Sequence, residues 1–216
     1  MKKTILTIAA LSMGVATSQA ALVIAGVIDG DLTGGNPKAI VLQATADIAD
    51  LSTWGVGSAN NGGGSDGEEY TLSGSVTNGQ YVVITGNNDS TTFFSTNFSG
   101  SNYLGFQSGA AGINGDDAIE LFSGGAVVDT FGDINVDGNG ETWEYVDGYS
   151  VRTGGTAGAY VDGNYSHNNG ALDALDEAAQ AAALGGAFSN FNVVPEPSST
   201  ALLGLGGLAL ILRRRK

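Results

Sequence analysis

The chain has 216 residues, with 35 glycines, 42% hydrophobic and 14% charged side chains, which leaves room for one domain of ordinary size with a substantial core. It carries 22 acidic residues against 8 Lys or Arg, and only Lys38 and Arg152 lie away from the two ends, so the mature surface repels phosphate backbones and excludes nucleic-acid binding. The lack of cysteine excludes disulfides, thiolate metal sites and thiol nucleophiles.

The first twenty residues have the three parts of a secretory signal peptide. Two lysines follow Met1, an apolar stretch covers residues 4–16, and the small-residue sequence Thr17-Ser18-Gln19-Ala20 comes next. We predict cleavage after Ala20, which would release an exported protein. The stretch is short for a membrane span, and a retained signal anchor is the alternative.

Short apolar runs recur from residue 22 to residue 131, with glycine, asparagine and aspartate between them. Each run has the length of a strand, and most are rich in Ile and Val, as half-buried strands are. The runs are Leu22–Ile28, Ala39–Gln43, Trp54–Val56, Tyr70–Leu72, Tyr81–Thr85, Ala118–Phe122 and Ala126–Phe131. Ser123-Gly124-Gly125 predicts a hairpin turn between the last two. The series predicts an all-β fold, an antiparallel β-sandwich.

Three polar segments, 60–69, 87–92 and 133–140, are expected to be loops that carry any binding activity. The alanine-rich segment 172–184 precedes Gly185-Gly186, which predicts a short helix with a glycine stop. The sequence leaves open whether this helix packs on the sandwich or only precedes a linker.

The C-terminal end has a second targeting pattern. It consists of Val194-Pro195-Glu196-Pro197, an apolar run over residues 200–212 and a basic cluster at 213–216. The prolines forbid a helix upstream, so the run predicts one short hydrophobic transmembrane helix. The basic cluster would hold the end of that helix on the cytoplasmic side. The three parts resemble the PEP-CTERM sorting signal of Gram-negative bacteria that make exopolysaccharide. The resemblance implies transient anchoring in the inner membrane, cleavage by an exosortase near Pro195, Glu196 and Pro197, and delivery to the cell surface or extracellular matrix. A plain membrane anchor is the alternative.

A second resemblance covers about residues 22 to 153. Its most distinctive segments are Asn114-Gly115-Asp116-Asp117-Ala118-Ile119-Glu120-Leu121 and Trp143-Glu144-Tyr145. Together with the strand-like runs in the same order, they are similar to the bacterial extracellular lamin tail domain. The resemblance implies an immunoglobulin-like sandwich used as a binding or adhesive module. Ile40-Val41-Leu42-Gln43 departs from the family, because it lacks the acidic residue and the Asn-Pro turn that are usual there.

These patterns divide the chain into four parts. They are a signal peptide at 1–20, a lamin-tail-like β-sandwich domain at 21–153, an extension with a short helix at 154–192, and a sorting signal with a transmembrane helix at 193–216.

The segment from 133 to 144 matches the oxygen-ligand pattern of a calcium-binding EF-hand loop. The ligand positions are Asp133, Asn135, Asp137, Asn139 and Glu144. Calcium prefers several oxygen ligands, and Gly138 would let the chain turn sharply beneath the ion. The flanking segments do not read as helices, which favours a chance match or a looser calcium site over a complete EF-hand.

Asp116, Asp117 and Glu120 could serve as paired carboxylates in hydrolysis. However, the two aspartates read first as a turn whose side chains bond the local backbone. Glu120 alternates with Ile119 and Leu121, which predicts a side chain on the solvent face.

The remaining candidates also have a structural interpretation. His167 is expected in a solvated polar loop, and no nucleophile with a base beside it can be identified. Arg152 is expected to pair with Asp129 or Asp147. The aromatic rings of Trp54 and Trp143 could stack on sugars, but core packing is their more usual role.

We therefore expect a non-enzymatic, exosortase-sorted surface or matrix protein whose sandwich is adhesive or structural within an exopolysaccharide layer or biofilm. Its expected partners are the exosortase and either extracellular polysaccharide or other surface proteins. A secreted hydrolase that uses acidic loop carboxylates, with calcium, is the alternative, and an inert spacer is a third interpretation.

Overall fold

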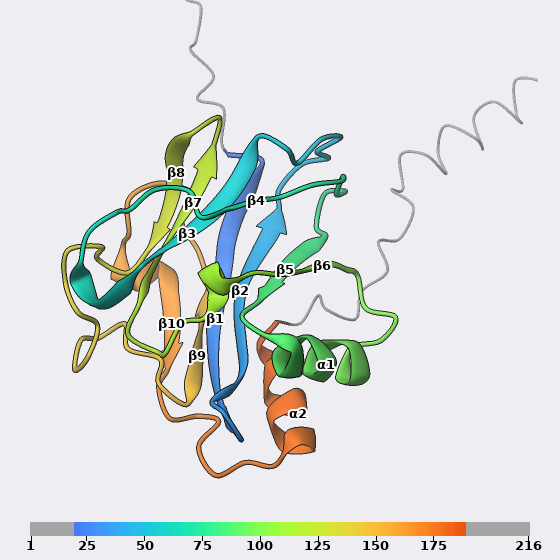
Figure 1. Cartoon of the computed structure of the whole chain (residues 1–216), viewed down its shortest axis with the longest axis vertical. Helices are drawn as coiled ribbons and strands as arrows, with labels where there is room; N and C mark the ends of the chain where they lie inside the picture. The colour runs from blue at the N-terminus through green and yellow to red at the C-terminus, as the bar shows by residue number, and fades with distance from the viewer. Residues whose placement is uncertain (1–19, 189–216) are drawn as a thin grey trace, which may run out of the picture.

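The computed structural model describes residues 20–188, and the segments 1–19 and 189–216 lie outside it. The described part is mostly β-sheet, with two sheets and two short helices (Figure 1). Its strands are β1 (Leu22–Leu32), β2 (Asn36–Ala44), β3 (Trp54–Ala59), β4 (Tyr70–Thr71), β5 (Tyr81–Thr85), β6 (Tyr103–Gln107), β7 (Ala118–Ser123), β8 (Ala126–Phe131), β9 (Gly148–Arg152) and β10 (Tyr165–Asn168). The helices are α1 (Asn88–Asn97) and α2 (Glu177–Ala187). The predicted strands all form, and β7 and β8 make the predicted hairpin.

Six strands form one sheet in the order β10-β9-β1-β2-β5-β6, and four form the other in the order β4-β3-β7-β8. All pairings are antiparallel except that of β5 with β6, which is parallel. The purely antiparallel prediction is therefore wrong at this edge. Parallel neighbours need a crossover connection. Here the crossover contains α1. Residues 87–92 were predicted to be a loop, but most of them belong to this helix.

The inner faces of the two sheets pack against each other and form the main core. Ile24, Leu42 and Ile84 come from the six-stranded sheet, and Leu121 and Phe131 come from the four-stranded sheet. All five are fully buried, with 0% exposure. The described part is thus a sandwich, held together mainly by apolar burial between its layers.

The outer face of the six-stranded sheet carries a second apolar cluster, covered by α1 and α2. Ile28 and Val83 pack there against Phe94, Leu184 and Phe188. The two helices lie near each other beside this sheet (Figure 1). The open question about the alanine-rich helix is answered, because α2 packs on the sandwich.

The predicted glycine stop of this helix is wrong. α2 begins after Asp176, whose carboxylate accepts a hydrogen bond from Ala179 N, and it runs through Gly185 and Gly186. Burial of Phe188, which follows the last turn, holds the helix end against the sheet. Neither helix of the described part has the length and hydropathy needed to cross a bilayer. The hydrophobic helix predicted at 200–212 lies outside the described residues.

The polar segment 60–69 lies across the outer face of the four-stranded sheet. A Cβ added to Gly57 on β3 would stand 2.3 Å from the backbone oxygen of Gly67, so the loop and the strand are in close contact. Gly57 pairs with Glu120 on β7. Glu120 is therefore only 4% exposed, and the prediction that it faces solvent is wrong, because this loop covers the sheet.

The loop expected around His167 is instead strand β10, at the edge of the six-stranded sheet. It pairs antiparallel with β9, and His167 lies directly opposite Ser150. Tyr165 packs into the main core and anchors this otherwise polar strand. Residues beyond 153 thus contribute to both sheet and core.

Candidate functional site

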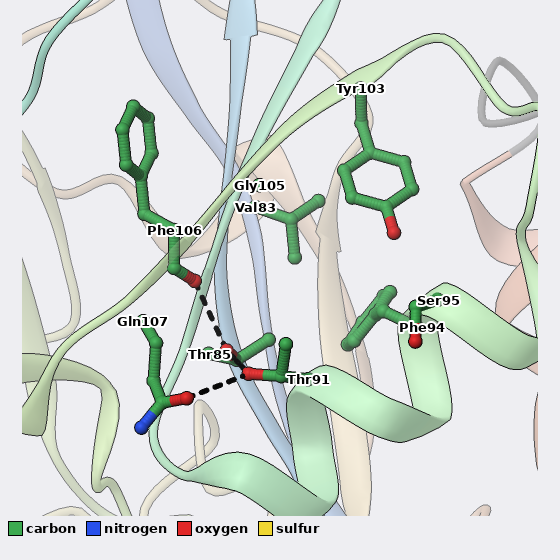
Figure 2. A pocket seen from close by; sticks show the side chains of 9 residues that line it. All are labelled: Val83, Thr85, Thr91, Phe94, Ser95, Tyr103, Gly105, Phe106 and Gln107. Carbon is green, nitrogen blue, oxygen red and sulfur yellow. Dashed lines mark hydrogen bonds between the residues drawn. The ribbon is translucent and has the colours of Figure 1, made fainter.

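A hollow of about 220 Å³ lies between α1 and the edge strand β6, above β5. Figure 2 shows its lining residues, which are Val83, Thr85, Thr91, Phe94, Ser95, Tyr103, Gly105, Phe106 and Gln107. At one end the hydroxyls of Thr85 and Thr91 are 2.6 Å apart, and Thr91 Oγ1 donates to Gln107 Oε1 at 3.2 Å (Figure 2). No lining side chain is charged, and the volume is below the roughly 300–1,000 Å³ of small-molecule pockets. The hollow suits an apolar side chain and offers no catalytic group.

Asp117 is a structural carboxylate. Its Oδ2 accepts a hydrogen bond from Asn114 N and its Oδ1 accepts one from Asn61 N, both at 3.1 Å. The first bond confirms the predicted turn, and the second ties the turn to the 60–69 segment. Burial raises the pKa of Asp117, and the two backbone N–H groups oppose that shift.

Asp116, the next residue, has a different environment. It is 8% exposed, and its Oδ1 is buried without a hydrogen-bond partner. Burial raises the pKa of Asp116, and the neighbouring charges of Asp117 and Asp137 add to the effect. The predicted carboxylate pair thus consists of one satisfied and one unsatisfied group.

Ser150, His167 and Asp162 form a chain that was not predicted from the sequence. Ser150 Oγ lies 2.9 Å from His167 Nδ1, and His167 Nε2 lies 3.4 Å from Asp162 Oδ1. This order of groups is that of a nucleophile, a base and an orienting acid. However, Ser150 is fully buried, with 0% exposure, so its hydroxyl does not meet a substrate in this conformation. The arrangement joins β9 to β10 and depends on strand register, for which the sequence gives no signal.

Arg152 pairs with Asp129, one of its two predicted partners. Arg152 Nη2 lies 2.6 Å from Asp129 Oδ2, and Arg152 Nε donates to Ile24 O at 2.7 Å. Asp129 also accepts hydrogen bonds from Ile24 N at 2.8 Å and Gly158 N at 3.0 Å. Because Asp129 lies on β8 and Arg152 on β9, this ion pair joins the two sheets. Its role is structural.

Lys38 forms the other internal ion pair, with Asp29, and donates a further hydrogen bond to Ile113 O at 2.6 Å. Burial raises the pKa of Asp29 to about 6, although Lys38 opposes the shift. The folded state therefore holds this proton more tightly than the unfolded state does. The resulting stabilisation is fully present below about pH 4, the ordinary aspartate pKa, and is lost as pH rises through 6.

We therefore expect the domain to melt at a higher temperature at pH 5 than at pH 7, with a gain of about 1–3 kcal/mol in the free energy of unfolding. A series of thermal melts between pH 4 and pH 8 measures this effect. Asp29→Asn should make the profile shallower, because it removes one of the aspartates whose pKa burial raises. A profile that is the same in wild type and variant would contradict the assignment to Asp29.

The three carboxylates among the five predicted calcium ligands do not gather within 4.8 Å of one another in the described part of the chain. The five ligands are Asp133, Asn135, Asp137, Asn139 and Glu144. The carboxylates at 133 and 137 each accept the backbone N–H two residues further on, at 2.9 and 3.0 Å, and so close local turns. No α-helix flanks the segment, which lies between β8 and β9. The arrangement is therefore not an EF-hand, and calcium binding in this loop remains a prediction.

A different set of three acidic residues has carboxylate oxygens within 4.8 Å of one another in the described part of the chain. It consists of Asp31, Asp147 and Asp173. Two of these are exposed and Asp147 is half-buried. Burial and the charges of the other two raise the pKa of Asp147. Exposed acidic groups of this kind are common in proteins without a bound ion.

The predicted binding loops 60–69 and 133–140 lie against each other. Gly64 N donates to Ile134 O at 2.8 Å, and Gly62 is so close that an added Cβ would stand 2.5 Å from Asp137 N. Trp54 and Trp143 are 8% and 3% exposed, so both rings belong to the core and not to a sugar-stacking surface. Two polar loops that the sequence predicted separately are therefore in contact with each other.

Among the predicted processing residues, Ala20 lies in the described part and Pro195, Glu196 and Pro197 lie outside it. Ala20 O accepts a hydrogen bond from Thr45 Oγ1 at 2.8 Å, and Thr45 N donates to Ala21 O at 2.9 Å. Ala20 and Ala21 are thus held beside Thr45, and cleavage after Ala20 remains a prediction.

Comparison with known proteins identifies the C-terminal end. Residues 193–216 match the PEP-CTERM protein-sorting motif. The motif marks an exported protein that an exosortase processes and that reaches the cell surface through a transient membrane anchor. The sorting signal predicted from the sequence is therefore confirmed, whereas the lamin tail resemblance remains a prediction. No curated protein matches the chain.

Proposed function

We propose that this chain is a surface protein whose β-sandwich is a non-catalytic adhesive or structural module within an exopolysaccharide layer. The observation that carries the proposal is the order of parts, in which an acidic, mostly β domain precedes the sorting motif at 193–216. The motif supplies the destination. The domain supplies polar loops on a rigid frame, as binding modules do.

We also propose that the domain is an immunoglobulin-like sandwich related to bacterial lamin tail domains. The two most distinctive segments of that resemblance lie together in space. Tyr145 N donates to Gly115 O at 2.7 Å, and Tyr145 Oη donates to Asp117 O at 3.0 Å. Tyr145 is fully buried, so the segments 114–121 and 143–145 form one packed unit. Because the two segments pack as one unit, we expect them to occur together in proteins that share this fold.

The adhesive surface that we propose is the pair of loops 60–69 and 133–140. Their mutual contacts fix them on the four-stranded sheet, so little conformational entropy is lost when a ligand binds. Extracellular polysaccharide is the proposed partner, because the loops offer many amide, hydroxyl and carboxylate groups to sugar hydroxyls. Another surface protein is the alternative partner.

The proposal is tested by locating the protein in cells with and without exosortase. We expect the processed protein at the surface of normal cells, and a longer form in the inner membrane of cells that lack exosortase. A Pro195→Ala/Pro197→Ala chain should stay in the membrane of normal cells. The processed protein should also be retained by exopolysaccharide purified from the same cells. An unchanged location without exosortase would contradict sorting, and failure to bind the polysaccharide would contradict the adhesive role.

In the described part, the Ser150, His167 and Asp162 chain favours a secreted hydrolase with a serine nucleophile, which differs from the expected rival that uses acidic loop carboxylates. A fluorophosphonate probe labels an accessible activated serine. Under our proposal the processed protein stays unlabelled before and after mild heating below its melting temperature. Labelling of wild type that is lost in Ser150→Ala would favour the hydrolase.

A further inference from the structure

Asp116 has no hydrogen-bond donor for one of its oxygens, unlike three other buried aspartates of the described part. Asp29 accepts from Lys38, Asp117 from two backbone N–H groups, and Asp129 from Arg152. Asp116 Oδ1 is buried and accepts no hydrogen bond. A buried carboxylate oxygen without a donor or a cation is costly, so this atom calls for a partner that is not a protein group.

The loop that follows β8 is fastened around Asp116 at two points. Gly138 N donates to Asp116 O at 3.0 Å, and Tyr145 N donates to Gly115 O at 2.7 Å. The residues next to these two anchors are Asp137 and Glu144. The backbone bonds therefore bring the backbone of two further acidic residues close to the Gly115-Asp116 turn. Burial raises the pKa of Asp116, and the charges of Asp117, Asp137 and Glu144 raise it further.

Close packing holds the loop in this position. A Cβ added to Gly138 would stand 2.6 Å from both Asp116 O and the ring of Trp143. Trp143 is itself 3% exposed and packs edge-on against Phe131 in the core. This packing fixes the loop backbone beside Asp116, so only the side chains of Asp137 and Glu144 can change position.

Each flanking carboxylate keeps one oxygen that is not engaged in a hydrogen bond. Asp137 Oδ1 accepts from Asn139 N, and Glu144 Oε2 accepts from Asn169 Nδ2 at 2.9 Å. These bonds leave Asp137 Oδ2 and Glu144 Oε1 for another partner. Asp137 is exposed and Glu144 half-buried, so both side chains can turn toward Asp116 without disturbing the core.

We propose that Asp116, Asp137 and Glu144 bind one divalent cation, with Asp116 Oδ1 as the buried ligand. Carboxylate oxygens are the ligands that Ca²⁺ prefers, and its flexible coordination tolerates an irregular loop better than Mg²⁺ does. In the described structure the three carboxylates are not gathered within 4.8 Å, so binding draws the two outer side chains inward. The site does not depend on which ligand the domain adheres to.

This proposed ligand set differs from the one expected from the sequence. Asp137 and Glu144 belong to the predicted loop, but Asp116 comes from a different segment, and the remaining predicted ligands are not required. With three carboxylates at the rim of a loop, we expect a dissociation constant of about 0.1–1 mM, the range of extracellular calcium modules. Bound calcium would make the loop surface rigid where the adhesive contact is proposed.

The test is calorimetric titration of Ca²⁺ into the processed protein, with thermal melts in calcium and in chelator. Asp116→Asn should weaken calcium binding at least tenfold and abolish the difference between the two melts. The matched control is Asp173→Asn, which makes the same change in the exposed acidic trio and should alter the affinity less than twofold. Glu144→Gln is the second variant, with an expected loss of at least fivefold.

The folded state of Asp116→Asn is checked in chelator, where it should melt no lower than wild type, because a buried negative charge has been removed. If it fails to fold, Glu144→Gln alone decides the matter. Wild type that binds no calcium, or variants at 116 and 144 that bind it as tightly as wild type, would overturn the proposal. Loss of binding in Asp173→Asn alone would assign the ion to the other trio and overturn it equally.

Discussion

Arg152→Met should lower the free energy of unfolding by about 3–5 kcal/mol, because it leaves Asp129 as a buried charge without its cation. Asp129 is 1% exposed, and the guanidinium is its only cationic partner among the described residues. The same guanidinium donates to Ile24 O and to the hydroxyl of Tyr165, so the change also unties β1 and β10 from this centre. Urea unfolding at pH 7 measures the loss.

The double variant Arg152→Met/Asp129→Asn separates the two contributions. Asparagine removes the uncompensated charge, so the double variant should be more stable than Arg152→Met alone. Lowering the pH should also rescue Arg152→Met, because burial already raises the pKa of Asp129 and loss of the arginine raises it further. A loss below about 1 kcal/mol in Arg152→Met would show that the pair behaves as a solvent-exposed salt bridge.

Most strands inside the sheets could be predicted from the sequence, but β9 inside the larger sheet and β6 and β10 at its edges could not. β2 and β5 are covered on both faces, so each contains a continuous run such as Ile40-Val41-Leu42. β6, at one edge, is half-exposed and interrupted by Gly105, and β10, at the other, is mostly polar. Backbone pairing with a neighbour holds these edge strands in place, and a local apolar pattern does not reveal such pairing.

Helix α1 was missed for a related reason. Its sequence is rich in asparagine, serine and threonine, which favour turns over helix interiors. The helix forms because Asn87 caps it by accepting a hydrogen bond from Ser90 N, and because Phe93 and Phe94 are buried in the second apolar cluster. Tertiary packing thus overrides the weak local preference of the segment.

The candidate site was predictable only where chemistry leaves few choices. The sequence has only two internal cations among many carboxylates, so an ion pair of Arg152 could be predicted. Asp129 is one of the two predicted partners. The contact between Ser150 and His167 depends on the register of two strands that the sequence did not pair. The unsatisfied oxygen of Asp116 depends on which backbone N–H groups reach the turn, and identical residue types at 116 and 117 differ in that respect.

A chain that ends after Thr153 should not fold, although the sequence places the boundary of the β-sandwich domain there. The removed residues include four buried anchors, Tyr165, Leu172, Leu184 and Phe188, which are at most 7% exposed. Burying a large apolar side chain contributes about 1.5–3 kcal/mol, so their loss costs roughly 6–12 kcal/mol. That is comparable with the whole stability of an ordinary domain, roughly 5–15 kcal/mol.

The matched control is a chain of residues 21–188, which keeps β10 and α2 and should melt cooperatively at nearly the temperature of the processed protein. Because Phe131 packs edge-on against Tyr165, at a centroid distance of 5.0 Å, the truncated chain should also lose the near-ultraviolet circular dichroism of its aromatic core. A cooperative melt of the 21–153 chain would contradict this argument. Such a melt would mean that the sandwich folds without the extension. The packing instead makes the extension part of the domain, because α2 covers the outer face of the six-stranded sheet and β10 pairs with β9.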